Sequence, residues 1–302
     1  MHIKVMLEYF YPWTNSAGIY LARQKGWYKD VGLDVECRTY DPLRGDSLTY
    51  LANGEVDFAL FPSNRLLVRR EQGAPVQGVA AINHRGLEAI QTIKQTGISR
   101  PRDLSGKRIA LNPTPRGMAM IRHIIENDGG NPNFIVVNSG VRELLSEDIA
   151  IGKADATFGS YWAWEILLDS AIPQNERIVW PVDEIGAPPY HSYLLGTNTP
   201  FSAQHPDVVR AFLAATQKGY VAVVNNPSIA VSIYEQVAPY FPESLIRRSL
   251  PLISKTWTHN GVWGHQRAAL LKPYAHWLKK HGILANANIW KEAVDNSFLP
   301  SL

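Results

Sequence analysis

The chain has 302 residues, just beyond the roughly 250–300 residues at which a single hydrophobic core stops growing, so its length favours two lobes. Apolar residues make up 45% and charged residues 19% of the sequence, which excludes a disordered or coiled-coil protein, and aromatic residues reach 10%. A net charge of +3 does not argue for a nucleic-acid partner, and the single cysteine, Cys37, excludes an intramolecular disulfide and a cysteine-based metal cluster.

The first third of the chain alternates short apolar runs with amphipathic stretches. The apolar runs predict strands at residues 3–7, 33–37, 57–60 and 76–82. The amphipathic stretches predict helices at residues 15–25, 46–52 and 64–72. Strands that alternate with helices of this length are typical of a mostly parallel sheet that is covered on both faces.

A second unit of the same kind begins near Leu104. Its pattern predicts a helix at residues 118–127 and strands at residues 107–111, 134–137, 154–158 and 178–180. From Pro206 onward the pattern becomes helical, with helices predicted at residues 207–224, 227–238, 243–252 and 264–281.

Two extended segments flank the second unit and predict how the chain is divided. Residues 87–93 and 189–196 are interpreted as hinge crossovers between two α/β lobes. One lobe is then built from residues 1–86 plus 197–302, and the other from residues 94–188. Because an α/β sheet binds ligands at the carboxyl ends of its strands, two such sheets are expected to place their loops around one ligand cleft.

The loops of the first lobe hold a first group of candidate ligand contacts. Four aromatic residues crowd residues 9–15, where each ring must either pack into the core or bind a ligand. The loops after the third and fourth strands carry polar side chains, for which the alternatives are a helix cap at Ser63 or Asn64 and a structural role for His84. The candidates in these loops are Trp13, Asn15, Ser63, Asn64 and His84.

The loops of the second lobe hold a second group. Residues 112–117 lie between a strand and a helix, where free backbone N–H groups favour an anion, although a rigid turn is an equal alternative. Residues 161–165 place a carboxylate among large aromatic rings, a combination that suits a planar ligand with amino groups or, alternatively, a helix start with its rings in the core. The candidates are Thr114, Arg116, Tyr161, Trp164 and Glu165.

Two later segments complete the candidate site. They are residues 188–193 and 257–264, and their candidates are Tyr190, His191 and Trp263. The nine histidines show no metal-ligand spacing, and no nucleophile motif is visible. The sequence therefore predicts no catalytic residue, no metal and no cofactor.

Several stretches of the chain match the sequence pattern of a known family. They are residues 15–22, 25–35, 53–58, 103–107 and 161–165, and the end from Trp263-Gly264 to Phe298-Leu299-Pro300. They resemble the periplasmic-type solute-binding proteins related to thiamin-pyrimidine biosynthesis. That family joins ABC-importer receptors for pyrimidine precursors of thiamin to the yeast-type pyrimidine synthase. Its opening stretch is shared with sulfonate- and nitrate-binding receptors.

The resemblance implies a type II periplasmic-binding-protein-like fold that closes on its ligand. It further implies that a flat aminopyrimidine, such as formylaminopyrimidine, is held between aromatic rings, with Glu165 reading its amino edge beside Tyr161 and Trp164. Trp13 and Ser16 differ from the receptor pattern near the first helix cap. This difference leaves a bulkier aromatic ligand such as riboflavin open.

Two departures from the synthase branch disfavour an enzyme. That branch has a sacrificial histidine in the loop after the third strand, where this chain reads Ser63-Asn64-Arg65. It also has a cysteine-rich run at the return crossover, where residues 188–193 contain no cysteine. Residues 112–117 depart from its glycine-rich phosphate loop. A pyrimidine-synthase-like enzyme of thiamin biosynthesis remains the alternative, together with a sulfonate- or nitrate-type receptor in which Arg85 or Arg116 matters more than Glu165.

The resemblance also implies partners and a location. The expected partners are the small heteroaromatic ligand and an ABC permease in the membrane, and the receptor itself is expected to be a monomer. No secretion leader precedes the first predicted strand. The expectation is therefore a periplasmic or extracellular protein whose leader was removed, or a cytoplasmic one if the chain is complete.

Overall fold

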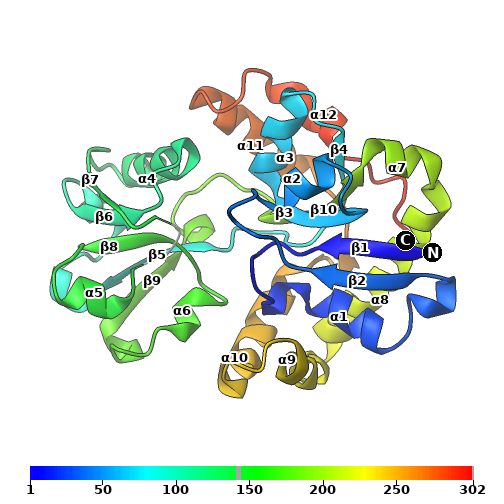
Figure 1. Cartoon of the computed structure of the whole chain (residues 1–302). Helices are drawn as coiled ribbons and strands as arrows, with labels where there is room; N and C mark the ends of the chain where they lie inside the picture. Colours follow the sequence, from blue (N-terminus) through cyan, green and yellow to red (C-terminus); the bar gives the residue numbers. More distant parts are fainter. Residues whose placement is uncertain (141–143, 301–302) are drawn as a thin grey trace. The chain divides into compact units, whose positions relative to one another are not determined.

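The computed structural model describes residues 1–140 and 144–300. The chain folds into two compact units (Figure 1). Unit 1 contains residues 1–85 and the chain from Tyr190 onward, and unit 2 contains residues 86–189. Parts of the two segments interpreted as crossovers, residues 88–93 and 193–196, lie in strands of the two sheets, and a hinge role for these segments stays a prediction. An extended apolar segment looks the same in sequence whether it links two lobes or pairs within one.

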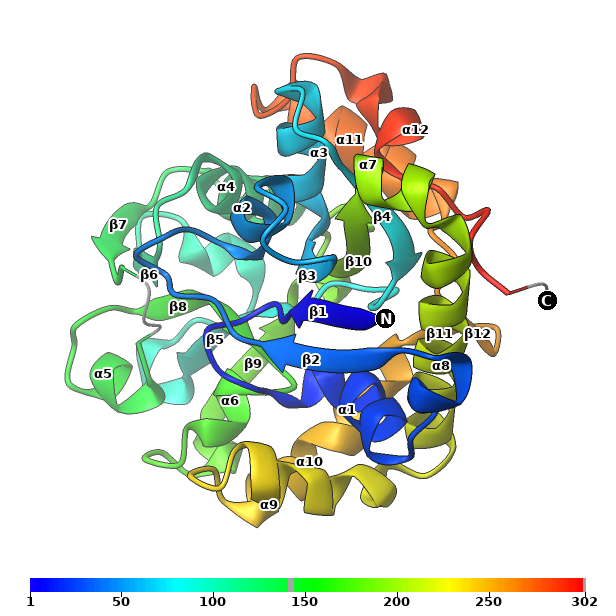
Figure 2. The same cartoon turned by 45° about the vertical axis from the view of Figure 1, so that its right-hand side comes forward.

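The sheet of unit 1 has the strand order β2-β1-β3-β10-β4. Its strands are β1 (His2–Met6), β2 (Asp34–Arg38), β3 (Phe58–Pro62), β4 (Val76–Ala81) and β10 (Tyr193–Asn198). Figure 2 shows β1 between β2 and β3, and β1 is parallel to both. In contrast, β10 is antiparallel to β3 and β4, with Tyr193 opposite Pro62 and Leu194 opposite Ala81. Residues just before β10 therefore lie at the same sheet edge as residues just after β3 and β4.

Helices cover this sheet, and one pair of them approaches closely. A Cβ atom on Gly219 of α8 would collide with the backbone carbonyl of Gly18 in α1, so both glycines are needed for the contact. Rings of Tyr28, Phe58 and Phe212 stack in the core between the sheet and α8. The helices of unit 1 are α1 (Ala17–Gln24), α2 (Ser47–Ala52), α3 (Ser63–Glu71), α7 (Thr199–Gln204), α8 (Pro206–Asn225), α9 (Val231–Val237), α10 (Glu243–Ile253), α11 (Ala268–Lys280) and α12 (Trp290–Ala293), with a small hairpin of β11 (Thr258–His259) and β12 (Val262–Trp263).

The sheet of unit 2 has the order β7-β6-β8-β5-β9. Its elements are β5 (Glu88–Ile93), β6 (Arg108–Leu111), α4 (Pro115–Asn127), β7 (Ile135–Asn138), α5 (Ser146–Ala150), β8 (Ala156–Tyr161), α6 (Glu165–Leu168) and β9 (Arg177–Pro181). Strand β6 is parallel to β7 and β8, whereas β5 is antiparallel to β8 and β9. The loops after β6 and β8, which carry the candidates of this unit, follow two neighbouring parallel strands and so lie at one edge of the sheet.

The predicted α/β fold class is confirmed, with one difference in each sheet. The sequence predicts mostly parallel strands, but β10 in unit 1 and β5 in unit 2 run antiparallel to both of their neighbours. Both strands are largely buried, and burial of this kind does not report the direction of a strand in its sequence. Within residues 1–140 and 144–300, no helix is both long enough and apolar enough to span a bilayer.

Candidate functional site

Most predicted candidates of unit 1 lie at one edge of its sheet. Trp13 and Asn15 precede α1 in the loop after β1, Ser63 and Asn64 begin α3 directly after β3, and His84 follows β4. His191 lies two residues before β10, which returns to the same edge. The side chain of Ser63 does not cap α3, because the cap position is Pro62. Asn64 is half-buried in the first turn of that helix.

A buried amide network connects the loops after β1 and β4. The Asn83 side-chain amide donates to Asn15 Oδ1 over 2.9 Å and to Thr256 Oγ1 over 2.8 Å. Asn15 Oδ1 also accepts from the indole Nε1 of Trp257 over 2.9 Å. Asn15 and Asn83 are fully buried, so each bond satisfies a group that water cannot reach. Asn15 is thus fixed in place by residues far away in the sequence.

His191 extends this network toward β3 and α11. Its Nε2 accepts from the backbone N–H of Arg267 over 3.0 Å, so the ring proton is on Nδ1, which donates to the Asn83 carbonyl over 2.8 Å. The Ser63 hydroxyl donates to the His191 carbonyl over 2.5 Å. Burial lowers the pKa of His191 to about 4. The neutral ring is therefore held by two backbone groups, and a ligand contact from His191 or Ser63 stays a prediction.

His84 differs from its neighbour His191. The residue is 9% exposed, and neither ring nitrogen has a hydrogen-bond partner within the described residues. Its ring centroid lies 5.1 Å from that of His191 and 6.2 Å from that of His259. Burial lowers the pKa of His84 to about 3, and the positive charge of Arg267 acts in the same direction. At neutral pH this imidazole offers one N–H donor and one lone pair.

The aromatic candidates of unit 1 pack into its core. Trp13 lies beside Tyr193, with ring centroids 6.1 Å apart, and its carbonyl accepts from the Tyr234 hydroxyl over 2.7 Å. Trp263 stacks on Tyr220 at 5.3 Å, and Tyr190 stacks on Tyr274 at 4.8 Å. All three candidate rings are buried. Part of the aromatic surplus therefore serves the core, and ligand contacts from these rings stay predictions.

Glu8 is a buried charged group that sequence reasoning missed. It follows β1 and is 3% exposed, and the Ser16 hydroxyl donates to its Oε2 over 2.7 Å. Burial raises the pKa of its carboxyl to about 7, against the opposing effect of hydrogen bonds that include the one from Ser16. The only signal in the sequence is a lone carboxylate directly after an apolar strand.

In unit 2, the carboxylate of Glu165 is built into a tight turn after β8. Its Oε2 accepts from the backbone N–H of Tyr161 over 2.9 Å, and the Trp164 N–H donates to the Tyr161 carbonyl over 3.0 Å. Trp162 is tied to the start of this unit through its indole Nε1, which donates to the Gly86 carbonyl over 3.1 Å. Trp164 is fully buried, whereas Tyr161, Trp162 and Glu165 are half-buried. The turn therefore holds a carboxylate and two partly accessible rings in fixed positions.

The other candidates of unit 2 surround the start of α4. Thr114 is its cap residue, and the hydroxyl oxygen accepts from the Gly117 N–H over 3.1 Å. Arg116 forms an ion pair with Glu88, and both side chains are largely buried. Because Glu88 offsets its charge, Arg116 is less available to an anion than a free arginine would be. Contacts from Thr114 and Arg116 to a ligand stay predictions.

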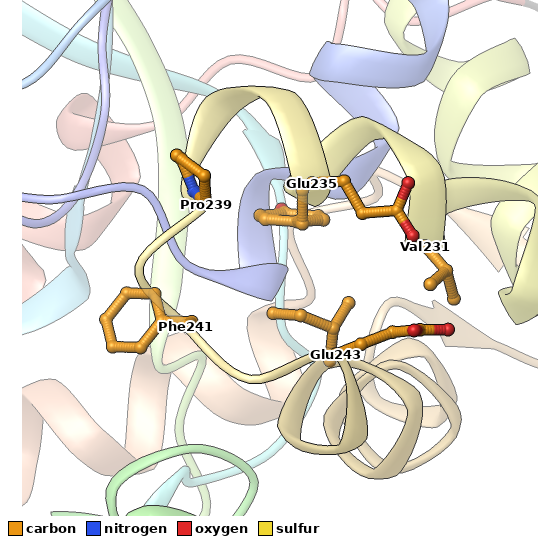
Figure 3. A pocket seen from close by; sticks show the side chains of 7 residues that line it. Val231, Glu235, Pro239, Phe241 and Glu243 are labelled. Atoms are coloured by element: carbon orange, nitrogen blue, oxygen red, sulfur yellow. The ribbon is translucent and has the colours of Figure 1, made fainter.

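A hollow lies between α9 and α10, and no predicted candidate is among the residues that line it (Figure 3). Its volume is about 220 Å³, and its walls include Tyr234, Phe241 and Ile246. Figure 3 shows the carboxylates of Glu235 and Glu243 on the side of Val231. Glu243 pairs with Arg247 at 2.5 Å, and the Phe241 ring lies 5.4 Å from that of Tyr11. Within residues 1–140 and 144–300, no group of three His, Cys, Asp or Glu residues is placed to hold a metal ion.

Two α/β units of these topologies define the class: the chain has the fold of the periplasmic binding proteins. The periplasmic aliphatic sulphonate-binding protein SsuA from Escherichia coli has a similar structure, with a TM-score of 0.73, covering 97% of this chain and 92% of that chain. The two sequences are 11% identical, so this likeness shows the fold alone.

The chain belongs to the NMT1/THI5-like family, whose model matches residues 13–230. This match confirms the resemblance inferred from the sequence. The chain is 26% identical over 297 residues to the formylaminopyrimidine-binding protein of Halalkalibacterium halodurans, covering 96% of this chain and 88% of the relative. It is also 26% identical over 238 residues to THI13 of Saccharomyces cerevisiae, a 4-amino-5-hydroxymethyl-2-methylpyrimidine phosphate synthase, covering 75% of this chain and 68% of the relative.

Proposed function

We propose that the chain is the solute-binding protein of an ABC importer and that it binds a small heteroaromatic vitamin precursor. The ligand is a thiamin pyrimidine such as formylaminopyrimidine. The observation that carries this proposal is the similarity to a formylaminopyrimidine-binding protein over nearly the full length of both chains. A membrane permease is then the partner, and the receptor acts in the periplasm or outside the cell.

The turn at residues 161–165 supports recognition of an aminopyrimidine. Ring N–H and amino groups are donors, and a carboxylate accepts such bonds with a contribution of about 1.5–3 kcal/mol each. Glu165 is held by the Tyr161 N–H, so its carboxylate is oriented before a ligand arrives. The half-buried rings of Tyr161 and Trp162 offer faces for stacking on a flat heterocycle.

Replacing Glu165 with glutamine tests this role. The glutamine amide has a similar shape but puts an NH2 donor where one carboxylate oxygen accepts. We expect Glu165→Gln to weaken binding of formylaminopyrimidine at least tenfold by titration calorimetry. The matched control is Glu126→Gln, because Glu126 is exposed on α4 in the same unit. Equal affinities of the two variants would remove Glu165 from the site.

A receptor and a synthase differ in what they release. The yeast relative named as a synthase covers three quarters of this chain, which is the specific observation for that second candidate. Our proposal predicts that the purified protein, incubated with a vitamin B6 phosphate and iron, yields no new pyrimidine by mass spectrometry. Appearance of a pyrimidine phosphate in that incubation would favour the synthase. The cysteine of this chain, Cys37, offers no ready thiolate, because burial raises its pKa to about 12.

A further inference from the structure

The hollow between α9 and α10 has a buried apolar floor and an acidic rim (Figure 3). Val231, Tyr234 and Ile246 form the floor, and all three are buried. Glu235 and Glu243 stand at the rim and are exposed. The volume is about 220 Å³. A cavity of roughly 150 Å³ accepts one benzene ring, so this hollow has room for a ring with a short side chain.

The polar side-chain groups that the hollow offers to a ligand are acceptors. The Tyr234 hydroxyl donates to the Trp13 carbonyl over 2.7 Å, so its proton is already used. The carboxylates of Glu235 and Glu243 only accept when they are ionised. None of the seven described residues that line the hollow carries a positive charge. A polar ligand that fits this lining must therefore be a hydrogen-bond donor.

The two carboxylates differ in how far their charge is compensated. Glu243 begins α10 and pairs with Arg247 at 2.5 Å, which offsets its charge. Glu235 forms no ion pair with a lysine or arginine within residues 1–140 and 144–300. It lies in the last turn of α9, which has no basic residue, and the negative end of a helix favours a cation over a carboxylate. The rim thus keeps one uncompensated negative charge.

We propose that the hollow binds a small organic cation, namely a single ammonium group on a short apolar or aromatic body. Glu235 accepts hydrogen bonds from the ammonium group, and Glu243 adds a weaker attraction. In Figure 3, Pro239 and Phe241 lie at the end of the hollow away from the two carboxylates, where the apolar body packs. The ring of Tyr234 also lines the hollow, and aromatic faces attract cations.

Phenethylammonium, which joins a benzene ring to an ammonium group through two carbons, is the probe. The protein is labelled with ¹³C at the isoleucine δ1-methyl groups, and Ile246 is assigned by the signal missing from Ile246→Val. We expect phenethylammonium to shift this signal in a saturable way at constant ionic strength. The neutral 2-phenylethanol has the same body and should bind more weakly, and the anion phenylacetate should leave the signal unmoved.

Substitutions at the rim test the role of charge. We expect Glu235→Gln to weaken phenethylammonium binding about fivefold, a modest effect because the carboxylate is exposed to water. Glu243→Gln should weaken it less, because Arg247 already offsets that charge. The matched control is Glu292→Gln, since Glu292 is exposed on α12 of the same unit and should leave the affinity unchanged.

Three results would each overturn the proposal. They are an Ile246 signal that phenethylammonium does not move, equal affinities for phenethylammonium and 2-phenylethanol, and equal affinities of Glu235→Gln and Glu292→Gln. Calorimetry on these two glutamine variants decides without the methyl assignment, so the test survives a failure of Ile246→Val to fold. No lining residue is a predicted pyrimidine contact, so either proposal can fail while the other stands.

Discussion

Replacing Glu8 with glutamine should change how the stability of unit 1 depends on pH. The pKa of the Glu8 carboxyl is about 7 in the folded protein, against 4.5 for an ordinary glutamate. The folded protein therefore holds this proton between pH 4.5 and pH 7, where the unfolded chain has lost it. The contribution of Glu8 to stability is full below pH 4.5 and is lost as the pH rises through 7.

The size of the effect follows from the two pKa values. At about 1.4 kcal/mol for each pH unit that separates the folded and unfolded pKa, the carboxylate destabilises the folded protein by roughly 3 kcal/mol above pH 7. Glutamine carries no charge, and its oxygen can still accept from Ser16, so Glu8→Gln escapes this loss. The free energy of unfolding of the variant, relative to the wild type, should rise by roughly 3 kcal/mol between pH 4.5 and about pH 8.

Two buried histidines act in the opposite direction. The folded pKa is about 3 for His84 and about 4 for His191, below the ordinary 6.5. Their contribution is full above pH 6.5 and is lost as the pH falls, because the unfolded chain then binds protons that the folded protein refuses. Near pH 5.5 each histidine lowers the free energy of unfolding by about 1.4 kcal/mol for each pH unit toward acid. Glu8 raises it by a similar amount over the same unit, so it offsets the effect of one histidine. Removing Glu8 should therefore make the loss of stability toward acid roughly twice as steep.

Urea unfolding across this pH range, followed by circular dichroism and tryptophan fluorescence, measures both effects. Glu126→Gln is the control, because its side chain is exposed in the folded protein and should give a difference from the wild type that does not change with pH. A difference between Glu8→Gln and the wild type that stays constant over the same range would refute the reasoning. It would mean that the Glu8 carboxyl reaches water or a positive charge in the folded state.

Two further substitutions test the packing that positions the site. Gly219→Ala should lower the free energy of unfolding by about 3 kcal/mol, because its Cβ would collide with the Gly18 carbonyl. The control is Gly54→Ala, which lies in an open turn at φ 72° and should lower it by only about 1 kcal/mol. Equal losses in urea unfolding would contradict the close approach of α1 and α8. Asn83→Ala should also cost about 3 kcal/mol, because it leaves the side-chain NH2 group of Asn15 buried without its acceptor, Asn83 Oδ1. A thermal midpoint like that of the wild type would show that the amide network does not hold the loops.

Local patterns predicted the elements better than their directions. Residues 3–7 alternate over an apolar face, and the strand there, β1, lies within one residue of that prediction at each end. The direction of β10 was not predictable, because the sequence of a largely buried strand does not report whether its neighbours run parallel or antiparallel to it. The turn at residues 161–165 was found because its carboxylate and rings are adjacent in the sequence, and its hydrogen bond spans four residues.

The rest of the candidate site depends on contacts between distant residues. Asn15 meets Asn83 across 68 residues and Trp257 across 242 residues, and no local pattern reports such pairs. Glu8 has no local signal that distinguishes it from a solvated carboxylate, and its burial appears only in the folded chain. The sequence likewise suggested that Trp13 and Trp263 line a cleft, although their rings also suit the core in which they lie.

The central claim is that this chain binds a small heteroaromatic vitamin precursor. Titration calorimetry of the purified protein with formylaminopyrimidine, hydroxymethylpyrimidine, riboflavin and an alkanesulfonate tests it most directly. The account predicts saturable binding of an aminopyrimidine well below millimolar concentration, with riboflavin and the alkanesulfonate weaker. Tightest binding of the alkanesulfonate, or no binding tighter than millimolar by any of the four compounds, would contradict it.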